Sequence, residues 1–128
     1  MTYYFSKTLK VPFTQAKERA IAALESEGFG VLTTIDVQAT LKKKLDVDFP
    51  GYLILGACNP HFAYQALQAE DKIGTMLPCN VILRDSGQGE VEVAAVDPAA
   101  SMQAIDNDSL SEIAGEVRLA LRRVIDAL

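Results

Sequence analysis

The chain has 128 residues, 49% of them hydrophobic and 23% charged, which is typical of one globular domain. Its net charge of −5 argues against nucleic-acid binding, because phosphates call for a basic surface. No apolar run approaches the roughly 20 residues that span a bilayer, and residues 1–7 lack the features of a signal peptide. We therefore expect a cytoplasmic protein with no membrane or nucleic-acid partner and with two free thiols.

The first predicted element is an edge strand over residues 3–9, which are rich in aromatic and β-branched side chains. Pro12 ends this strand. Apolar side chains then recur at helical spacing from Phe13 to Leu24, and Gly28 is placed to end that helix in a left-handed conformation.

Residues 29–35 predict a second strand, with Phe29, Val31, Thr33 and Ile35 on one face. Asp36 follows as the N-cap of a short helix with an apolar stripe of Val37, Leu41 and Leu45. Lys42, Lys43 and Lys44 fall at the C-terminal end of that helix, where cations complement the helix dipole. An anion site is the alternative reading of these lysines.

The middle of the chain contains its most apolar strand, residues 52–57, which we place in the centre of the sheet. Asn59-Pro60 then signals a helix start, since Asn caps free backbone N–H groups and Pro fits the first helical position. Residues 81–84 and 91–96 flank a loop with two glycines and predict a β-hairpin.

The end of the chain carries a continuous helical pattern. Asp97-Pro98 repeats the cap-and-proline signal, and the last helix is expected to begin near Ser109, with Glu112 completing a capping box. Its apolar stripe comprises Leu110, Ile113, Val117, Leu121, Val124 and Leu128. This long helix needs a face to cover, so residues 1–128 predict a single two-layer α+β domain with a mainly antiparallel sheet.

The candidate site residues stand at two strand ends. Cys58-Asn59 closes one apolar run, and Cys79-Asn80 opens the next. Cys58 would precede a helix N-terminus, where positive partial charge favours a thiolate, so we expect it to be the more ionised thiol. The alternative is that both cysteines are small buried hydrophobes.

Other chemistry at these positions is less favoured. His61 is the only histidine, and nothing fixes a third member for a Cys58–His61 nucleophile pair. Cys58, His61 and Cys79 would suit zinc as a ligand set, but their spacing is no recognised zinc pattern, so we expect no metal site. A reducing cytoplasm disfavours a disulfide between the two cysteines.

Three stretches, residues 28–44, 56–60 and 73–81, together resemble the bacterial and archaeal domain-of-unknown-function 302 family. The resemblance implies a fold similar to the TATA-binding-protein-like class, with helices on a curved antiparallel sheet. It also implies a homodimer, and it implies neither a settled activity nor a cofactor. The family's signature residues fall here on Asp36, Lys44, Cys58, Asn59, Pro60, Gly74, Pro78, Cys79 and Asn80.

Two functional hypotheses follow from the sequence. In the first, Cys58 and Cys79 line a small-ligand or thiol-redox site, Asn59 and Asn80 orient a ligand, and Asp36 or Lys44 lies nearby. In the second, the protein is a non-catalytic, homodimeric interaction domain whose cysteines only pack. The reactivity of the thiols distinguishes the two.

Overall fold

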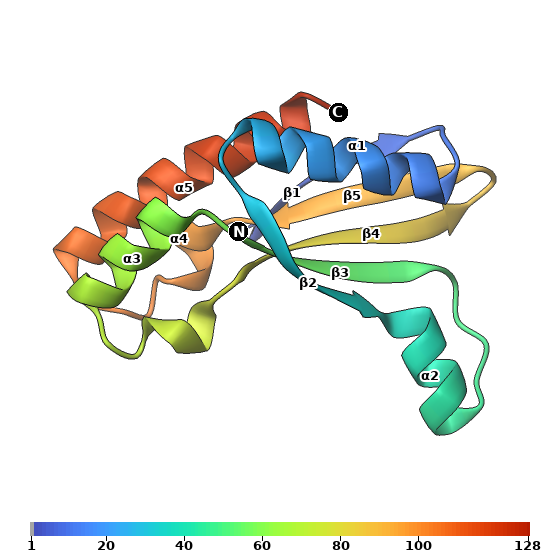
Figure 1. Cartoon of the computed structure of the whole chain (residues 1–128), viewed down its shortest axis with the longest axis horizontal. Coiled ribbons are helices and arrows are strands. Elements are labelled where there is room, and N and C mark those ends of the chain that lie inside the picture. Colours follow the sequence, from blue (N-terminus) through green and yellow to red (C-terminus); the bar gives the residue numbers. More distant parts are fainter. Residues whose placement is uncertain (1) are drawn as a thin grey trace.

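The computed structural model describes residues 2–128 and is built on a five-stranded sheet in the order β1-β5-β4-β3-β2, in which every neighbouring pair is antiparallel (Figure 1). The strands are β1 (Tyr4–Leu9), β2 (Gly30–Asp36), β3 (Tyr52–Cys58), β4 (Cys79–Gly87) and β5 (Glu90–Val96). The helices are α1 (Phe13–Ser26), α2 (Val37–Leu45), α3 (Pro60–Ala69), the 3-10 turn η1 (Ile73–Met76), α4 (Pro98–Ser101) and α5 (Asp108–Asp126). The predicted α+β fold class is confirmed.

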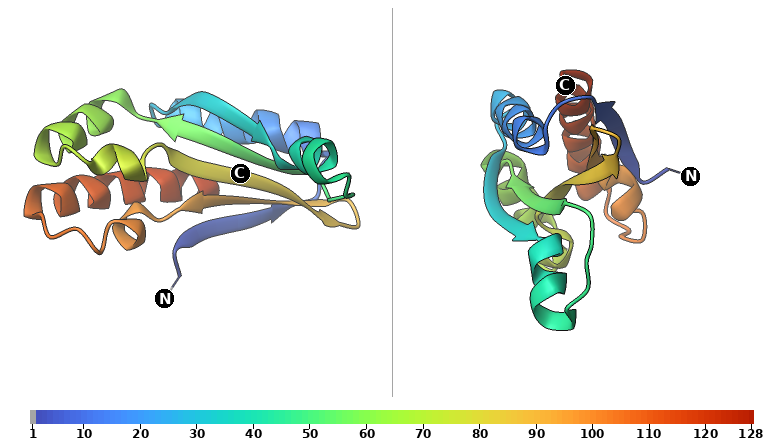
Figure 2. Two further views of the ribbon diagram at one scale, coloured as in Figure 1. Left: turned by 90° about the horizontal axis from the view of Figure 1, so that it is seen from below. Right: turned by 90° about the vertical axis from the view of Figure 1, so that its right-hand side faces the viewer.

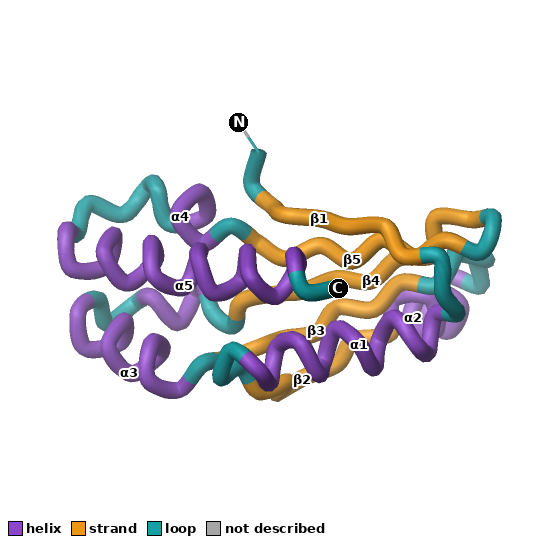
Figure 3. The backbone as a smooth tube through the Cα atoms, turned by 90° about the horizontal axis from the view of Figure 1, so that it is seen from above, coloured by secondary structure: helices purple, strands orange, loops and turns teal. Residues whose placement is uncertain are grey.

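The helices are distributed unequally over the two faces of the sheet. Helices α1 and α5 lie side by side on one face, and α3 and α4 pack near the end of the sheet where α5 begins (Figures 1 and 3). Helix α2 projects on the opposite side (Figure 2). The main core therefore lies between the sheet and the layer formed by α1 and α5.

Helix α5 buries the apolar stripe that the sequence predicts, with Leu110, Leu121 and Val124 at most 1% exposed. The helix begins one residue earlier than predicted, because Asn107 is the cap and its Oδ1 accepts a hydrogen bond from the Leu110 N–H at 3.2 Å. Asn107 also donates to the carbonyl of Ala69 at 2.8 Å, which ties the start of α5 to the end of α3.

The β4–β5 hairpin is tighter than the predicted loop. Both strands extend into it, and only Gln88 and Gly89 form the turn, both with positive φ (57° and 73°). Two consecutive positive φ values are the geometry whose twist matches that of the flanking antiparallel strands.

Strand β2 contains a bulge that overturns the predicted alternation of its side chains. Val31 pairs with Ala57 and Thr33 pairs with Gly56, so Leu32 is an extra residue without a partner on β3. One extra residue moves the following side chains to the other face of the sheet. Phe29 and Val31 therefore pack against the core, whereas Thr33 and Ile35 do not share their face.

Strand β3 is an interior strand, although β4 holds the centre of the sheet. Its Leu55 and Ala57 are fully buried in the core, and the alternate residues Ile54 and Gly56 face the other way. This other side of the sheet, which bears Ile54, Gly56 and Ile82, is here called the open face. In the part of the chain that the structure describes, no helix is long and apolar enough to cross a membrane.

Candidate functional site

The two cysteines lie on neighbouring strands at one end of the sheet. Cys79 is the first residue of β4 and pairs with Ala57, and Cys58 follows Ala57 as the last residue of β3. With strands about 4.8 Å apart and residues about 3.4 Å apart, the two Cα atoms are separated by roughly 6 Å. Both thiols are free and half-buried.

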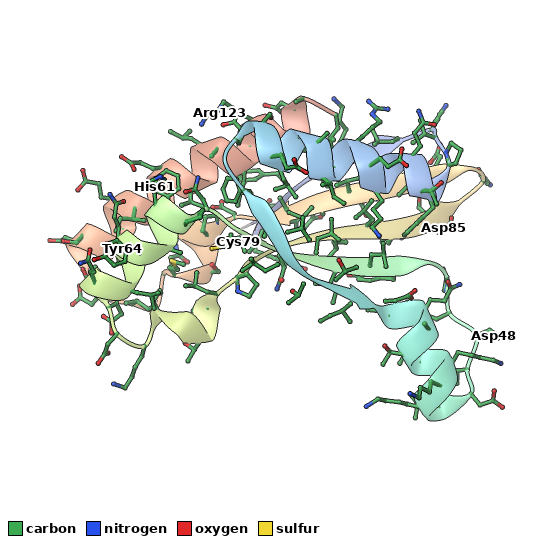
Figure 4. The ribbon with its side chains drawn as sticks, viewed as in Figure 1. Asp48, His61, Tyr64, Cys79, Asp85 and Arg123 are labelled. Carbon is green, nitrogen blue, oxygen red and sulfur yellow. The ribbon has the colours of Figure 1, made fainter. Side chains whose placement is uncertain are left out.

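A cavity of about 40 Å³ lies between this end of the sheet and helices α3, α4 and α5. Cys58, Asn59 and Cys79 line it, so the structure brings together three of the six predicted site residues (Figure 4, where Cys79 is labelled). The remaining walls are almost entirely apolar, with Phe29, Phe62 and Met102 among them. In a regular strand, the side chain of Cys58 would point to the face of the sheet opposite to that of Cys79. Both side chains nevertheless line one cavity, because β3 ends at Cys58.

Burial in this apolar setting raises the pKa of the Cys79 thiol from about 9.0 to about 11, and the neighbouring Cys58 contributes to the shift in the same direction. At neutral pH only roughly one Cys79 side chain in ten thousand is a thiolate. The contribution from Cys58 indicates that its side chain lies close enough to affect the pKa of Cys79.

Asn59 joins the start of α3 to the loop that follows α1. Its Oδ1 accepts hydrogen bonds from the N–H groups of His61 (3.2 Å) and Phe62 (3.4 Å), which confirms the predicted cap. Its Nδ2 donates to the carbonyl of Glu27 at 3.4 Å. The amide is therefore occupied by backbone partners, and its role at the cavity is to hold α3 in place beside Cys58.

Gly56 allows the segment before Cys79 to pack closely on the open face. A methyl group on Gly56 would lie 2.8 Å from Cγ of Pro78 and in still closer contact with Oγ1 of Thr33. The Leu77–Pro78 peptide bond is cis, and Pro78 also lines the cavity. The position of Cys79 at the wall of the cavity thus depends on the absence of a side chain at residue 56.

The other three predicted residues lie away from the cavity. Asn80 follows Cys79 on β4, so strand alternation places it on the open face, where it is exposed. Asp36 caps α2 through Oδ1, which accepts from the Ala39 N–H at 2.9 Å, and it lies six residues along β2 from Gly30, the partner of Cys58. Lys44 is exposed in the last turn of α2, at the opposite end of the sheet from the cysteines (Figure 1).

His61 is exposed on α3 and is not among the residues that line the cavity. Within residues 2–128, no three His, Cys, Asp or Glu side chains gather in an arrangement that could hold a metal ion. The chemically reactive side chains that line the cavity are the thiols of Cys58 and Cys79.

The far wall of the cavity is formed by residues that the sequence does not predict as part of a site. Met102, which follows α4, and Ile113 and Ala114 of α5 complete it. The apolar stripe of α5 identified a core-facing surface, but no local pattern showed that part of this stripe would face the two cysteines.

An antiparallel sheet with one helical layer and a thiol-lined cavity at one end defines a small α+β domain. The chain belongs to the family described as "Domain of unknown function DUF302", whose model matches residues 5–128, so the resemblance is confirmed. It is similar to the crystal structure of an uncharacterized conserved protein DUF302 from Bacillus stearothermophilus, with a TM-score of 0.91 and 26% sequence identity. That match covers 99% of this chain and 98% of the other chain. The chain matches no protein with a curated description.

Proposed function

We propose that this protein is a thiol–disulfide exchange module in which Cys58 and Cys79 act as a pair. The observation that carries the proposal is the placement of both thiols on adjacent strands at one cavity, close enough for one to shift the pKa of the other. Their Cα separation of roughly 6 Å, estimated from strand spacing, falls within the ~4.4–6.8 Å range found for disulfides.

The two thiols have different surroundings, which supports different roles. Cys58 comes immediately before the cap of α3, and the start of a helix stabilises negative charge. Cys79 holds its proton at neutral pH, because its pKa is raised to about 11. We assign the attack on an external disulfide to Cys58 and the resolving step to Cys79.

The exchange is balanced with a disulfide as the oxidant. The Cys58 thiolate attacks one sulfur of the substrate disulfide, a mixed disulfide forms, and the first substrate thiolate leaves. This thiolate, or water, takes the proton from Cys79, whose sulfur then attacks Sγ of Cys58. The products are a Cys58–Cys79 disulfide and two substrate thiols, so two electrons pass from the protein to the substrate.

The size of the cavity favours thiol chemistry over the binding of an organic ligand. Ligand pockets usually measure about 300–1,000 Å³, whereas this cavity measures about 40 Å³. That space suffices for water, which needs roughly 10–15 Å³.

Oxidised glutathione tests the proposal when intact mass and peptide mapping follow the reaction of the folded protein. We expect the wild type to lose two hydrogens as the Cys58–Cys79 disulfide forms. Cys79→Ser should accumulate a stable glutathione adduct on Cys58, because its resolving thiol is absent. Cys58→Ser should stay unmodified while folded, since Cys79 is rarely ionised.

The same variants in denaturing urea are the control, because every remaining cysteine should react there. A Cys58 that reacts only after unfolding would contradict the proposal. The cysteines would then serve packing alone, in a non-catalytic interaction domain.

A further inference from the structure

Three sulfur-bearing side chains line the cavity at the end of the sheet. Cys58 and Cys79 reach it from β3 and β4, and Met102, the residue that follows α4, forms part of its far wall. All three are partly buried. The chain has two cysteines and three methionines, so three of its five sulfur atoms belong to residues that line one cavity. A cavity with this lining can hold a cation that prefers sulfur.

The rest of the lining offers a cation almost nothing else. Among residues 2–128, the only other polar side chain at the cavity is that of Asn59, and both ends of its amide are engaged by backbone groups. The remaining walls are apolar, with Phe29 and Phe62 among them. A bound cation would therefore find sulfur ligands and no carboxylate or imidazole.

This ligand set favours copper in its Cu(I) state. Thiolates and thioethers are soft ligands and select Cu(I), whereas calcium and magnesium take oxygen ligands. Structural zinc takes four ligands, and no three His, Cys, Asp or Glu side chains gather for it within residues 2–128. The expectation of no metal site follows from zinc spacing, so it does not apply to an ion that needs only two or three sulfur ligands.

The spacing of the two cysteines suits one shared ion. A metal–thiolate bond measures about 2.3 Å in zinc sites, so two sulfur atoms on one ion lie at most ~4.6 Å apart. Cysteines with Cα atoms roughly 6 Å apart can bring their sulfur atoms within that distance. The cavity of about 40 Å³ exceeds the roughly 10–15 Å³ that a water molecule needs, so a single ion fits.

The charge of the complex also suits the site. One Cu(I) ion and two thiolates together carry a charge of −1. Cys58 immediately precedes Asn59, the cap of the ten-residue helix α3, and the start of a helix stabilises negative charge. A monovalent ion therefore leaves a single negative charge, next to the backbone N–H groups that stabilise it.

We propose that Cys58, Cys79 and Met102 bind one Cu(I) ion, with the two thiolates as the main ligands and the thioether as the third. Two thiols and one Cu(I) ion give the complex and two protons, and no atom changes its oxidation state. The ion and a Cys58–Cys79 disulfide exclude each other, because both use the same two sulfur atoms. Binding requires only the reduced cavity and does not rest on the proposed exchange activity.

Competition with bathocuproine disulfonate, a chelator that absorbs visible light when it holds Cu(I), tests the site in the absence of oxygen. The reduced wild type should withdraw one Cu(I) ion per chain. Cys58→Ser and Cys79→Ser should each weaken binding at least about 100-fold, because each removes a thiolate ligand. Zn²⁺ should bind the wild type far more weakly than Cu(I).

Met102→Leu tests the third ligand with little effect on packing, because the two side chains have similar volumes. It should weaken Cu(I) binding by about 10-fold. Met76→Leu is the matched control, since Met76 is 42% exposed and does not line the cavity. This control should bind as the wild type does, and circular dichroism shows that each variant is folded.

X-ray absorption at the copper edge gives a second readout that needs no variant. Only sulfur should be bonded to copper in the wild type, and Met102→Leu should have one sulfur fewer. No uptake of Cu(I), nitrogen or oxygen bonded to copper, or uptake that persists without both cysteines would overturn the proposal. Equal binding by Met102→Leu and Met76→Leu would overturn the thioether ligand.

The two proposals for this cavity can fail separately. Cu(I) uptake by a protein whose Cys58 forms no adduct with oxidised glutathione would refute disulfide exchange alone. Disulfide exchange by a protein that leaves all Cu(I) with the chelator would refute the copper site alone.

Discussion

Replacing Gly56 by Ala tests the close packing that positions Cys79. The added methyl group would stand 2.8 Å from Cγ of Pro78 and would also meet Oγ1 of Thr33. Thr33 is exposed on an edge strand and can change rotamer, whereas the ring of Pro78 can move only with its backbone. Overpacking of this kind costs about 1–3 kcal/mol.

The expected change in melting temperature follows from the size of the chain. An unfolding entropy of about 2.1 cal/mol/K per residue gives about 0.27 kcal/mol/K here, so a loss of about 2 kcal/mol lowers Tm by roughly 7 °C. Differential scanning calorimetry measures this change.

Gly30→Ala is the matched control, because it changes a glycine of the same sheet with no atom within 4 Å of the new methyl group, and we expect its Tm to stay close to that of the wild type. Adding Thr33→Ala to Gly56→Ala should recover only part of the loss, since the contact with Pro78 persists. A Gly56→Ala protein that melts within about 1 °C of the wild type would refute the reasoning.

Three further predictions concern the core, a buried carboxylate and pH. Val117→Asp should prevent soluble folding, because Val117 is 7% exposed and the new charge would be unpaired. Leu119→Asp on the same helix should fold, and circular dichroism of the soluble fractions compares the two variants. Asp97→Ala should lower the free energy of unfolding in urea by about 2 kcal/mol, because Asp97 caps α4 and accepts a hydrogen bond from Arg118 at 3.1 Å. Asp71→Ala, which removes only an exposed ion pair, should change it by less than about 0.5 kcal/mol. The folded Cys79 thiol keeps its proton up to about pH 11 and the unfolded one only to about 9.0, so stability should be greatest below pH 9 and fall by about 2–3 kcal/mol by pH 11. Unfolding curves of Cys79→Ala that keep the same decline would contradict the last prediction.

The features that the sequence predicts well are those with local causes. Asp36, Asn59 and Asp97 each cap the helix expected after them, because a short polar side chain in front of an apolar run satisfies nearby N–H groups. The stripe of α5 is similarly local, since helical periodicity alone determines which face is buried.

The candidate site was predictable only in part. The positions of Cys58 and Cys79 at neighbouring strand ends could be inferred from the two apolar runs that they border. Adjacency in sequence suggests that Asn80 lines the same site as Cys79, but a strand sends adjacent side chains to opposite faces. Met102 joins the cavity through tertiary packing of α4 and α5, for which the sequence carries no local signal.

The bulge at Leu32 affects how the sheet meets other chains. Strand β2 is an edge strand, and its segment from Val31 to Ile35 is uncharged, lacks proline and is rich in β-branched residues, which favours the addition of strands and fibril growth. An incoming strand needs an unbroken, regularly spaced row of N–H and C=O groups, and the extra residue interrupts that row. The bulge thereby protects the sheet against extension at this edge.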